Sequence, residues 1–248
     1  MDYSCTLKFR SHEFQPIVED WISWDRMRKW IPDHQRGYEK SKDSKHFPSG
    51  FRLIHVKDRR VISIIEPGTK FVALSYVWGA CVEEEDGLLE DNKAEFEKPD
   101  GLKRLPRGIE DAIKICQKLD YLYLWVDRYC IIQDEGHPEK QDQINAMAVI
   151  YSSAELTLIN ASGSSMHEPI PGVTTNRKSL QSKETMFGFE FTNAYPDFRS
   201  LLKNTTWFKR GWTYQEAVLS RRKLIFTPFE TFFEDSQGGL SFLVMGFS

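Results

Sequence analysis

The sequence is poor in cysteine, and the few cysteines it has lie far apart: Cys5, Cys81, Cys116 and Cys130. None belongs to a CxxC pair, so the chain lacks the spacing of a cysteine-ligated zinc site or a thiol redox motif. The six histidines also lack paired ligand spacing: His12, His34, His46, His55, His137 and His167. We therefore predict reduced thiols and no metal site.

A strong net charge and long apolar runs are also missing. The formal net charge is −3, which gives no electrostatic reason to expect nucleic acid or an anionic membrane as a partner. No apolar run approaches the roughly 20 residues needed to cross a bilayer. The start after Met1 is acidic and mixed, unlike the basic and then apolar layout of a signal peptide. We expect a cytoplasmic protein.

What the chain does contain is enough for a substantial core. Of its 248 residues, 40% are apolar and 13% aromatic, as in globular proteins. We predict one main domain over residues 51–248, with an N-terminal helical extension over residues 1–50 packed on it. Apolar residues at helical spacing predict an amphipathic helix over residues 12–31 within that extension.

Short apolar runs rich in β-branched residues predict the strands of the main domain. Residues 51–65 fit a hairpin. Further strands are predicted at residues 71–76, 121–126, 155–160 and 223–227. Helical patterns separate the first three of these, one beginning near Pro106 and the next carrying Ile144 and Tyr151 on one face. This alternation indicates an α/β fold with an open, mainly parallel sheet and helices on both faces.

Polar and aromatic residues stand where the predicted strands end. They are Ser75, Tyr76, Trp78 and Gly79 after the first strand, Asp127 and Arg128 after the second, and Asn160, Ala161 and Ser162 after the third. Ligands of open parallel sheets bind beyond the carboxyl ends of the strands, so we expect these residues to converge on one crevice. Residues 162–206 are rich in turn formers and form a long insertion, which is a candidate lid over that crevice.

Three motifs occur in the order seen in fungal heterokaryon-incompatibility (HET) domains: FVALSYVWG at 71–79, YLYLWVDRYCIIQDE at 121–135 and RGWTYQE at 210–216. Over roughly residues 51–227 the chain resembles that family. Two departures stand out. His55 occupies a position that is usually acidic in the family, and of the Cys/His cluster often found upstream the chain has His34 alone. Members of the family trigger cell death when genetically different fungal cells fuse.

HET domains are in turn similar to Toll/interleukin-1 receptor (TIR) domains, which have a flavodoxin-like sheet. Ser75-Tyr76, Asp127 and the Trp212-to-Glu216 element match TIR motif positions. The resemblance implies that Glu216 is catalytic in cleaving NAD, a substrate here rather than a cofactor, or a related dinucleotide. It also implies substrate-binding residues: Ser75, Tyr76, Trp78, Gly79, Asp127, Arg128, Arg210, Trp212 and Gln215. Self-association and a regulatory or sensor partner are further implied.

The chemistry of NAD suits a single carboxylate. Glycosidases generally need two carboxylates, because a leaving oxygen must be protonated. Nicotinamide already carries positive charge and leaves as a neutral ring, so one carboxylate beside the ribose is enough to stabilise the developing cation. An aromatic ring such as that of Trp78 or Trp212 can stack on the nicotinamide.

Each of these residues also has a structural interpretation. Trp78 and Trp212 can be buried anchors, Asp127 can cap the next turn, and Glu216 can be a first-turn carboxylate favoured by the helix dipole. Cys130 is a core thiol rather than a nucleophile. Three functional classes therefore stay open: a NAD-consuming enzyme, a non-catalytic signalling module that self-associates, and a nucleotide-binding sensor without turnover.

Overall fold

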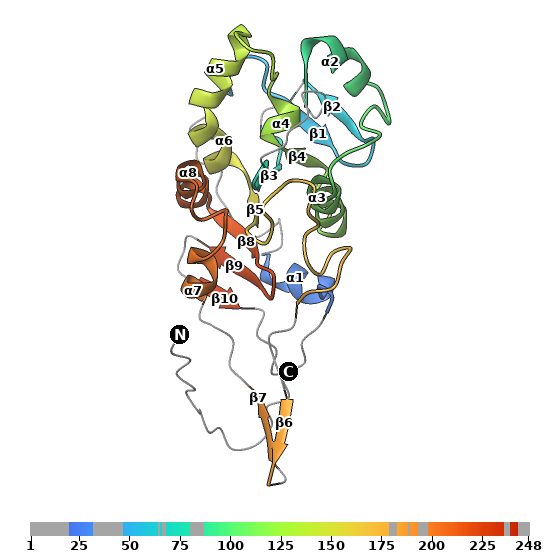
Figure 1. Ribbon diagram of the computed structural model, residues 1–248. Coiled ribbons are helices and arrows are strands. Elements are labelled where there is room, and N and C mark those ends of the chain that lie inside the picture. Colours follow the sequence, from blue (N-terminus) through green and yellow to red (C-terminus); the bar gives the residue numbers. More distant parts are fainter. Residues whose placement is uncertain are drawn as a thin grey trace.

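The computed structural model describes residues 20–31, 47–63, 65, 68–79, 87–178, 183–187, 189–192, 198–235 and 239–242. Its main feature is an eight-stranded sheet in the order β10-β9-β8-β5-β3-β4-β1-β2 (Figure 1). The strands are β1 Leu53–His55, β2 Arg60–Ile62, β3 Val72–Ser75, β4 Tyr123–Trp125, β5 Leu156–Asn160, β8 Arg222–Phe226, β9 Thr231–Asp235 and β10 Gly239–Phe242. All four strands predicted at 71–76, 121–126, 155–160 and 223–227, and the hairpin at 51–65, are confirmed.

The centre of the sheet is parallel. β4, β3, β5 and β8 run in the same direction, and helices occur in each connection between them. Along the chain the four parallel strands follow one another as β3, β4, β5 and β8. In the sheet, however, β3 lies between β4 and β5, which is the strand order of a flavodoxin-type sheet. The strand order therefore reverses between β3 and β5, which is where open α/β sheets bind ligands.

Outside this centre the pairing is antiparallel: the hairpin predicted over 51–65 forms one side of the sheet, and the β9–β10 hairpin, which was not predicted, forms the other. The eight-stranded sheet has three parallel pairings and four antiparallel ones. The antiparallel pairings belong to the β1–β2 hairpin beside β4 and to the β9–β10 hairpin beside β8. Residues 56–59 join β1 to β2, residues 227–230 join β8 to β9 and residues 236–238 join β9 to β10, and connections this short permit only antiparallel pairing.

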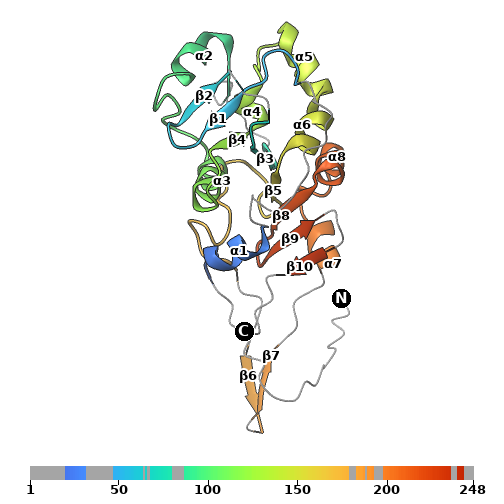
Figure 2. The same ribbon diagram turned by 180° about the vertical axis from the view of Figure 1, so that it is seen from behind.

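Helices cover both faces of the sheet, as predicted. They are α1 Trp24–Trp30, α2 Glu90–Phe96, α3 Arg107–Lys118, α4 Asp127–Cys130, α5 Pro138–Asn145, α6 Met147–Ser153, α7 Phe198–Lys203 and α8 Gly211–Leu219. Figures 1 and 2 show α3 on one face and α6 and α8 on the other. None of the helices in the described ranges is both long and apolar enough to cross a bilayer.

Two predicted helices differ from those observed. The helix predicted over 12–31 is helical at Trp24–Trp30, while residues 20–23 are not helical and residues 12–19 lie outside the described ranges. The pattern carrying Ile144 and Tyr151 is divided at Ala146 into α5 and α6. By contrast α3 begins after Pro106, as predicted, and buries Ile109 and Cys116.

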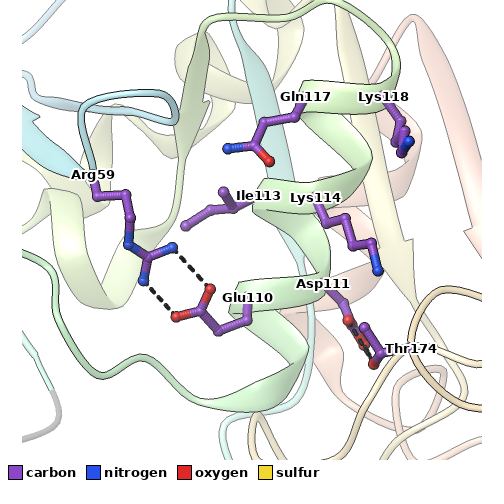
Figure 3. Close-up of a pocket in the computed structure, with 8 residues that line it drawn as sticks. All are labelled: Arg59, Glu110, Asp111, Ile113, Lys114, Gln117, Lys118 and Thr174. Atoms are coloured by element: carbon purple, nitrogen blue, oxygen red, sulfur yellow. Dashed lines mark hydrogen bonds and ion pairs between the residues drawn. The ribbon is translucent and has the colours of Figure 1, made fainter. Parts of the chain in front are cut away.

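The insertion over residues 162–206 leaves the main sheet, as expected, but is not a single lid. Its hairpin, β6 Lys183–Met186 with β7 Phe189–Thr192, is a separate two-stranded sheet that projects away from β3 (Figures 1 and 2). The segment before the hairpin packs on α3 instead. There Asp111, which is 1% exposed, accepts hydrogen bonds from Ile170 N at 2.7 Å and Thr174 Oγ1 at 2.8 Å (Figure 3).

Replacing Asp111 by alanine should therefore lower the free energy of unfolding by about 1–3 kcal/mol, because the buried N–H of Ile170 loses its acceptor. Asparagine keeps an acceptor oxygen and nearly the same volume, so Asp111→Asn should lose less. Urea unfolding of the two variants checks this. Equal stability of the alanine variant and the unmodified chain would show that Asp111 does not anchor the insertion.

Candidate functional site

The candidate site lies at the carboxyl end of β3. Ser75 is the last residue of this strand, and Asp127 is the first residue of α4, directly beyond β4. Glu216 comes from α8, which packs on both β3 and α6. The sequence folds this way because parallel neighbours carry their carboxyl ends to the same edge of a sheet, and α8, which covers one face of the sheet, packs on β3 before β8 begins.

Ser75 and Glu216 form the centre of the site. The Ser75 hydroxyl donates a hydrogen bond to Glu216 Oε2. Trp207 Nε1 donates to Ser75 Oγ at 2.7 Å. Ser75 is 1% exposed, Trp207 2% and Glu216 9%, so all three groups are withdrawn from bulk water.

Asp127 forms a second centre with Trp78 and Arg128. Trp78 Nε1 donates to Asp127 Oδ2 at 3.0 Å, and the backbone N–H of Arg128 donates to Asp127 Oδ1 at 2.7 Å. The guanidinium carbon of Arg128 lies 5.0 Å from the centroid of the Trp78 ring, which is a cation–π contact. Asp127 therefore does bond the start of the next turn, and it also holds the indole of Trp78.

Arg210 connects the two centres. Its Nη1 donates to the backbone oxygen of Tyr76 at 2.8 Å, and its charge favours the ionised forms of both Asp127 and Glu216. The hydroxyl of Tyr76 is buried near Asp127. Burial and the charge of Asp127 raise the pKa of Tyr76 well above its usual value, so this side chain stays neutral.

Gly79 is required by the backbone that leaves the site. Its φ is +103°, and a Cβ there would lie 2.8 Å from Ser165 Oγ. The backbone N–H of Met166 donates to Trp78 O at 3.2 Å in the same place. The first part of the insertion therefore covers the end of β3, although its hairpin does not.

Most of the predicted site residues thus lie close together. Ser75, Tyr76, Trp78, Asp127, Arg128, Arg210 and Glu216 are joined by direct contacts or by the electrostatic interactions above, and Gly79 follows Trp78. Trp212 and Gln215 lie on α8, and their side chains are outside the described part of the chain. Glu216 is the sixth residue of α8, so its interpretation as a first-turn carboxylate is wrong.

Two residues near Glu216 were not predicted. Trp207 lies between α7 and α8, directly after the insertion, and Tyr151 comes from α6 with its hydroxyl donating to Leu74 O at 3.1 Å. The signal for Trp207 was present, because it begins the aromatic stretch WFKRGW that leads into α8. Cys130 is confirmed as a core thiol, since burial raises its pKa to about 12.

Burial dominates the electrostatics of the site. It raises the pKa of Glu216 from 4.5 to about 7, with the negative charge of Asp127 acting in the same direction. The hydrogen bond from Ser75 and the charge of Arg210 act in the opposite direction. Burial also raises the pKa of Asp127, against its hydrogen bonds with Arg128 N and Trp78. A carboxyl that titrates near neutrality in a desolvated site is a candidate for chemistry.

Two cavities lie outside this cluster. One, of about 520 Å³, follows the outer face of α3 and is crossed by the Arg59–Glu110 ion pair (Figure 3). The other, of about 420 Å³, lies beyond the ends of β5 and β8 and is bounded by Ser162, Glu168 and Phe229 among others. Thr206, the neighbour of Trp207, also lines this second cavity. The Ser75–Glu216 pair itself is closely packed.

Comparison with known proteins finds one family over the region that contains the site. A family model described as heterokaryon incompatibility protein (HET) matches residues 71–216, more than half of the chain. Heterokaryon incompatibility protein 6, OR allele, of Neurospora crassa is 30% identical over 105 residues, which are 38% of this chain and 15% of that protein. The chain thus corresponds to a small part of that relative. No solved structure matches it.

The raised pKa of Glu216 predicts a specific pH dependence of stability. The folded chain holds the Glu216 proton more tightly than the unfolded chain does, so the stabilising contribution is complete below pH 4.5 and is lost as pH rises through about 7. Glu216→Gln has no such proton. Relative to this variant, the unmodified chain should lose up to about 3 kcal/mol of unfolding free energy across that window. Urea unfolding at a series of pH values measures this difference. If the unfolding free energies of the two proteins change with pH in parallel, Glu216 ionises as an ordinary exposed carboxyl.

Proposed function

The chain belongs to the heterokaryon incompatibility (HET) family, and we propose that it acts in fungal incompatibility by hydrolysing NAD, or a close dinucleotide relative, with Glu216 as the essential carboxylate. The family match and the Neurospora crassa relative support the incompatibility role. One observation carries the enzymatic part of the proposal. Glu216, which the TIR resemblance marks as catalytic, is a buried carboxylate hydrogen-bonded to Ser75 at the end of β3.

The proposed reaction breaks the bond between the nicotinamide nitrogen and C1′ of the ribose. The bonding electron pair leaves with nicotinamide, which becomes neutral, and positive charge develops on the ribose. An ionised Glu216 beside the ribose stabilises that charge, more strongly in a desolvated site than in water. Water then adds to C1′ and releases a proton, which yields nicotinamide and ADP-ribose.

The state of ionisation of Glu216 follows from its surroundings. A carboxyl with a pKa of about 7 is partly protonated at neutral pH, and the ionised fraction increases as pH rises. Ser75 and Arg210 favour the ionised form. Under the proposal NAD cleavage needs that form, so the rate should rise as pH rises through about 7.

A second function, a non-catalytic module that self-associates, is favoured by a different observation. Ser75 and Glu216 are buried and bonded to each other, and the two cavities above lie outside them. Among the described residues, Glu216 is too buried for a substrate to reach it without a rearrangement. If assembly of several chains, as in TIR domains, provides it, cleavage should depend on protein concentration. A pure signalling module would assemble without releasing nicotinamide, and a sensor would bind NAD without consuming it.

Glu216→Gln tests the enzymatic role, because it keeps the shape of the side chain and removes the negative charge. It should lower the rate of NAD cleavage by about two orders of magnitude or more, the scale expected when one preorganised electrostatic group is lost. Nicotinamide release, followed chromatographically, is the measurement. Glu168→Gln is a matched control, since Glu168 is exposed and lines the separate cavity beyond β5. A folded Glu216→Gln variant with full activity would refute the assigned role.

A further inference from the structure

The hydrogen bonds around Ser75 have a direction that only one of its partners can impose. The indole of Trp207 has an N–H and no acceptor, so at 2.7 Å it must donate to Ser75 Oγ. This bond uses a lone pair of the Ser75 oxygen. The Ser75 proton then points elsewhere, and Glu216 Oε2 is the acceptor in hydrogen-bonding distance.

The ionised form of Glu216 satisfies all three groups at once. Trp207 donates to Ser75, Ser75 donates to Glu216, and the carboxylate accepts. A neutral Glu216 can accept the Ser75 proton only through its carbonyl oxygen, which is a weaker acceptor than a carboxylate, and a proton carried on Oε2 itself would leave the Ser75 proton without this acceptor. Leaving a buried donor without a partner is unfavourable. Bonds in such a chain also polarise one another, so the indole strengthens the bond that Ser75 gives to the carboxylate.

We propose that Trp207 is a positioning residue for Glu216: by donating its indole N–H to Ser75 Oγ, it commits the Ser75 proton to the carboxylate, orients that carboxylate and favours its ionised form. The consequence of this contact for catalysis rests on the proposed NAD hydrolysis, whereas its effect on the ionisation of Glu216 does not. Trp207 lies outside the motifs RGWTYQE and FVALSYVWG. It lies between α7 and α8, so a connection outside the sheet completes the site.

The other groups that face Glu216 do not replace this role. Asp127, from the start of α4, opposes ionisation of Glu216, and Arg210, directly before α8, favours it. Tyr151, from α6, also favours the ionised form through its own hydrogen bond to Glu216, and its hydroxyl lies 3.1 Å from Leu74 O. Ser75 differs from these groups because Trp207 donates to its oxygen, and this contact directs the Ser75 proton to Glu216.

Trp207 also packs in an apolar cluster with Ile159, Leu201 and Phe232, so a loss of packing must be separated from a loss of the hydrogen bond. Trp125 provides the matched control. It is fully buried, it packs edge-to-face on Tyr151, and its Nε1 has no hydrogen-bond partner among the described residues. Trp125→Phe removes indole volume near the site without removing a donor, whereas Trp207→Phe removes both.

The test is the pH at which Glu216 titrates, measured as the difference in unfolding free energy between each protein and the same protein carrying Glu216→Gln. In Trp207→Phe the midpoint should move upward by about 0.5 to 1 pH unit, the effect expected for one net hydrogen bond. In Trp125→Phe it should not move. An unchanged midpoint in Trp207→Phe, or an equal shift in both variants, would overturn the proposal.

A second measurement needs no tryptophan variant and holds even if Trp207→Phe does not fold. The indole N–H resonance of Trp207, followed by nitrogen-15 NMR, should shift with pH at the midpoint of Glu216 in the unmodified chain. In Glu216→Gln this step should be missing. A resonance that does not respond near that pH in the unmodified chain would contradict the coupling.

The NAD assay separates this inference from the proposed function. If the chain cleaves NAD, the acidic limb of its pH–rate profile should move upward in Trp207→Phe by the same amount as the stability midpoint. If the chain does not cleave NAD but the stability midpoint moves, the proposed reaction fails and the role of Trp207 stands. If the chain cleaves NAD and neither midpoint moves, the role of Trp207 fails and the reaction stands.

Discussion

The hydrogen bond between Ser75 and Glu216 joins residues 141 positions apart, and much of the surrounding structure is arranged so that it can form. A carboxylate withdrawn from water is unfavourable unless it is paired or hydrogen-bonded. Here the compensation comes from Ser75 on β3 and from the charge of Arg210 before α8. It remains partial, because burial still raises the pKa of Glu216 to about 7. This combination of a desolvated carboxylate and nearby polar groups is typical of catalytic sites.

The sheet supports this bond in two ways. Its parallel centre carries the ends of β3 and β4 to one edge, and β3, buried on both faces, gives Ser75 a rigid position. The segments flanking the β6–β7 hairpin then close the edge, since Met166 bonds the backbone at Trp78 and Trp207 bonds Ser75. The start of the insertion is therefore part of the site, whereas the β6–β7 hairpin within it projects away (Figure 1).

The central strands were predictable from their short apolar runs, and the geometry of parallel strands brings Ser75 and Asp127 to one edge. The place of Glu216 beside them was implied by the TIR resemblance. Other features depend on tertiary contacts that leave little local signal. The division between α5 and α6 occurs at Ala146, with no glycine or proline to mark it. Trp207 begins the aromatic stretch WFKRGW, but nothing in its spacing indicates Ser75 as its partner. The β1–β2 hairpin was predicted, whereas β9 and β10 were not.

The most direct test of the account is nicotinamide release from NAD by the purified, unmodified chain at low and high protein concentration. The account predicts nicotinamide and ADP-ribose in equal amounts, with a higher rate per chain at high concentration if assembly opens the buried site. A rate of product formation that rises with pH around 7, where Glu216 ionises, would link the chemistry to this carboxylate. No release at any concentration, from protein shown to be folded and assembled, would contradict the enzymatic claim and favour a non-catalytic signalling module.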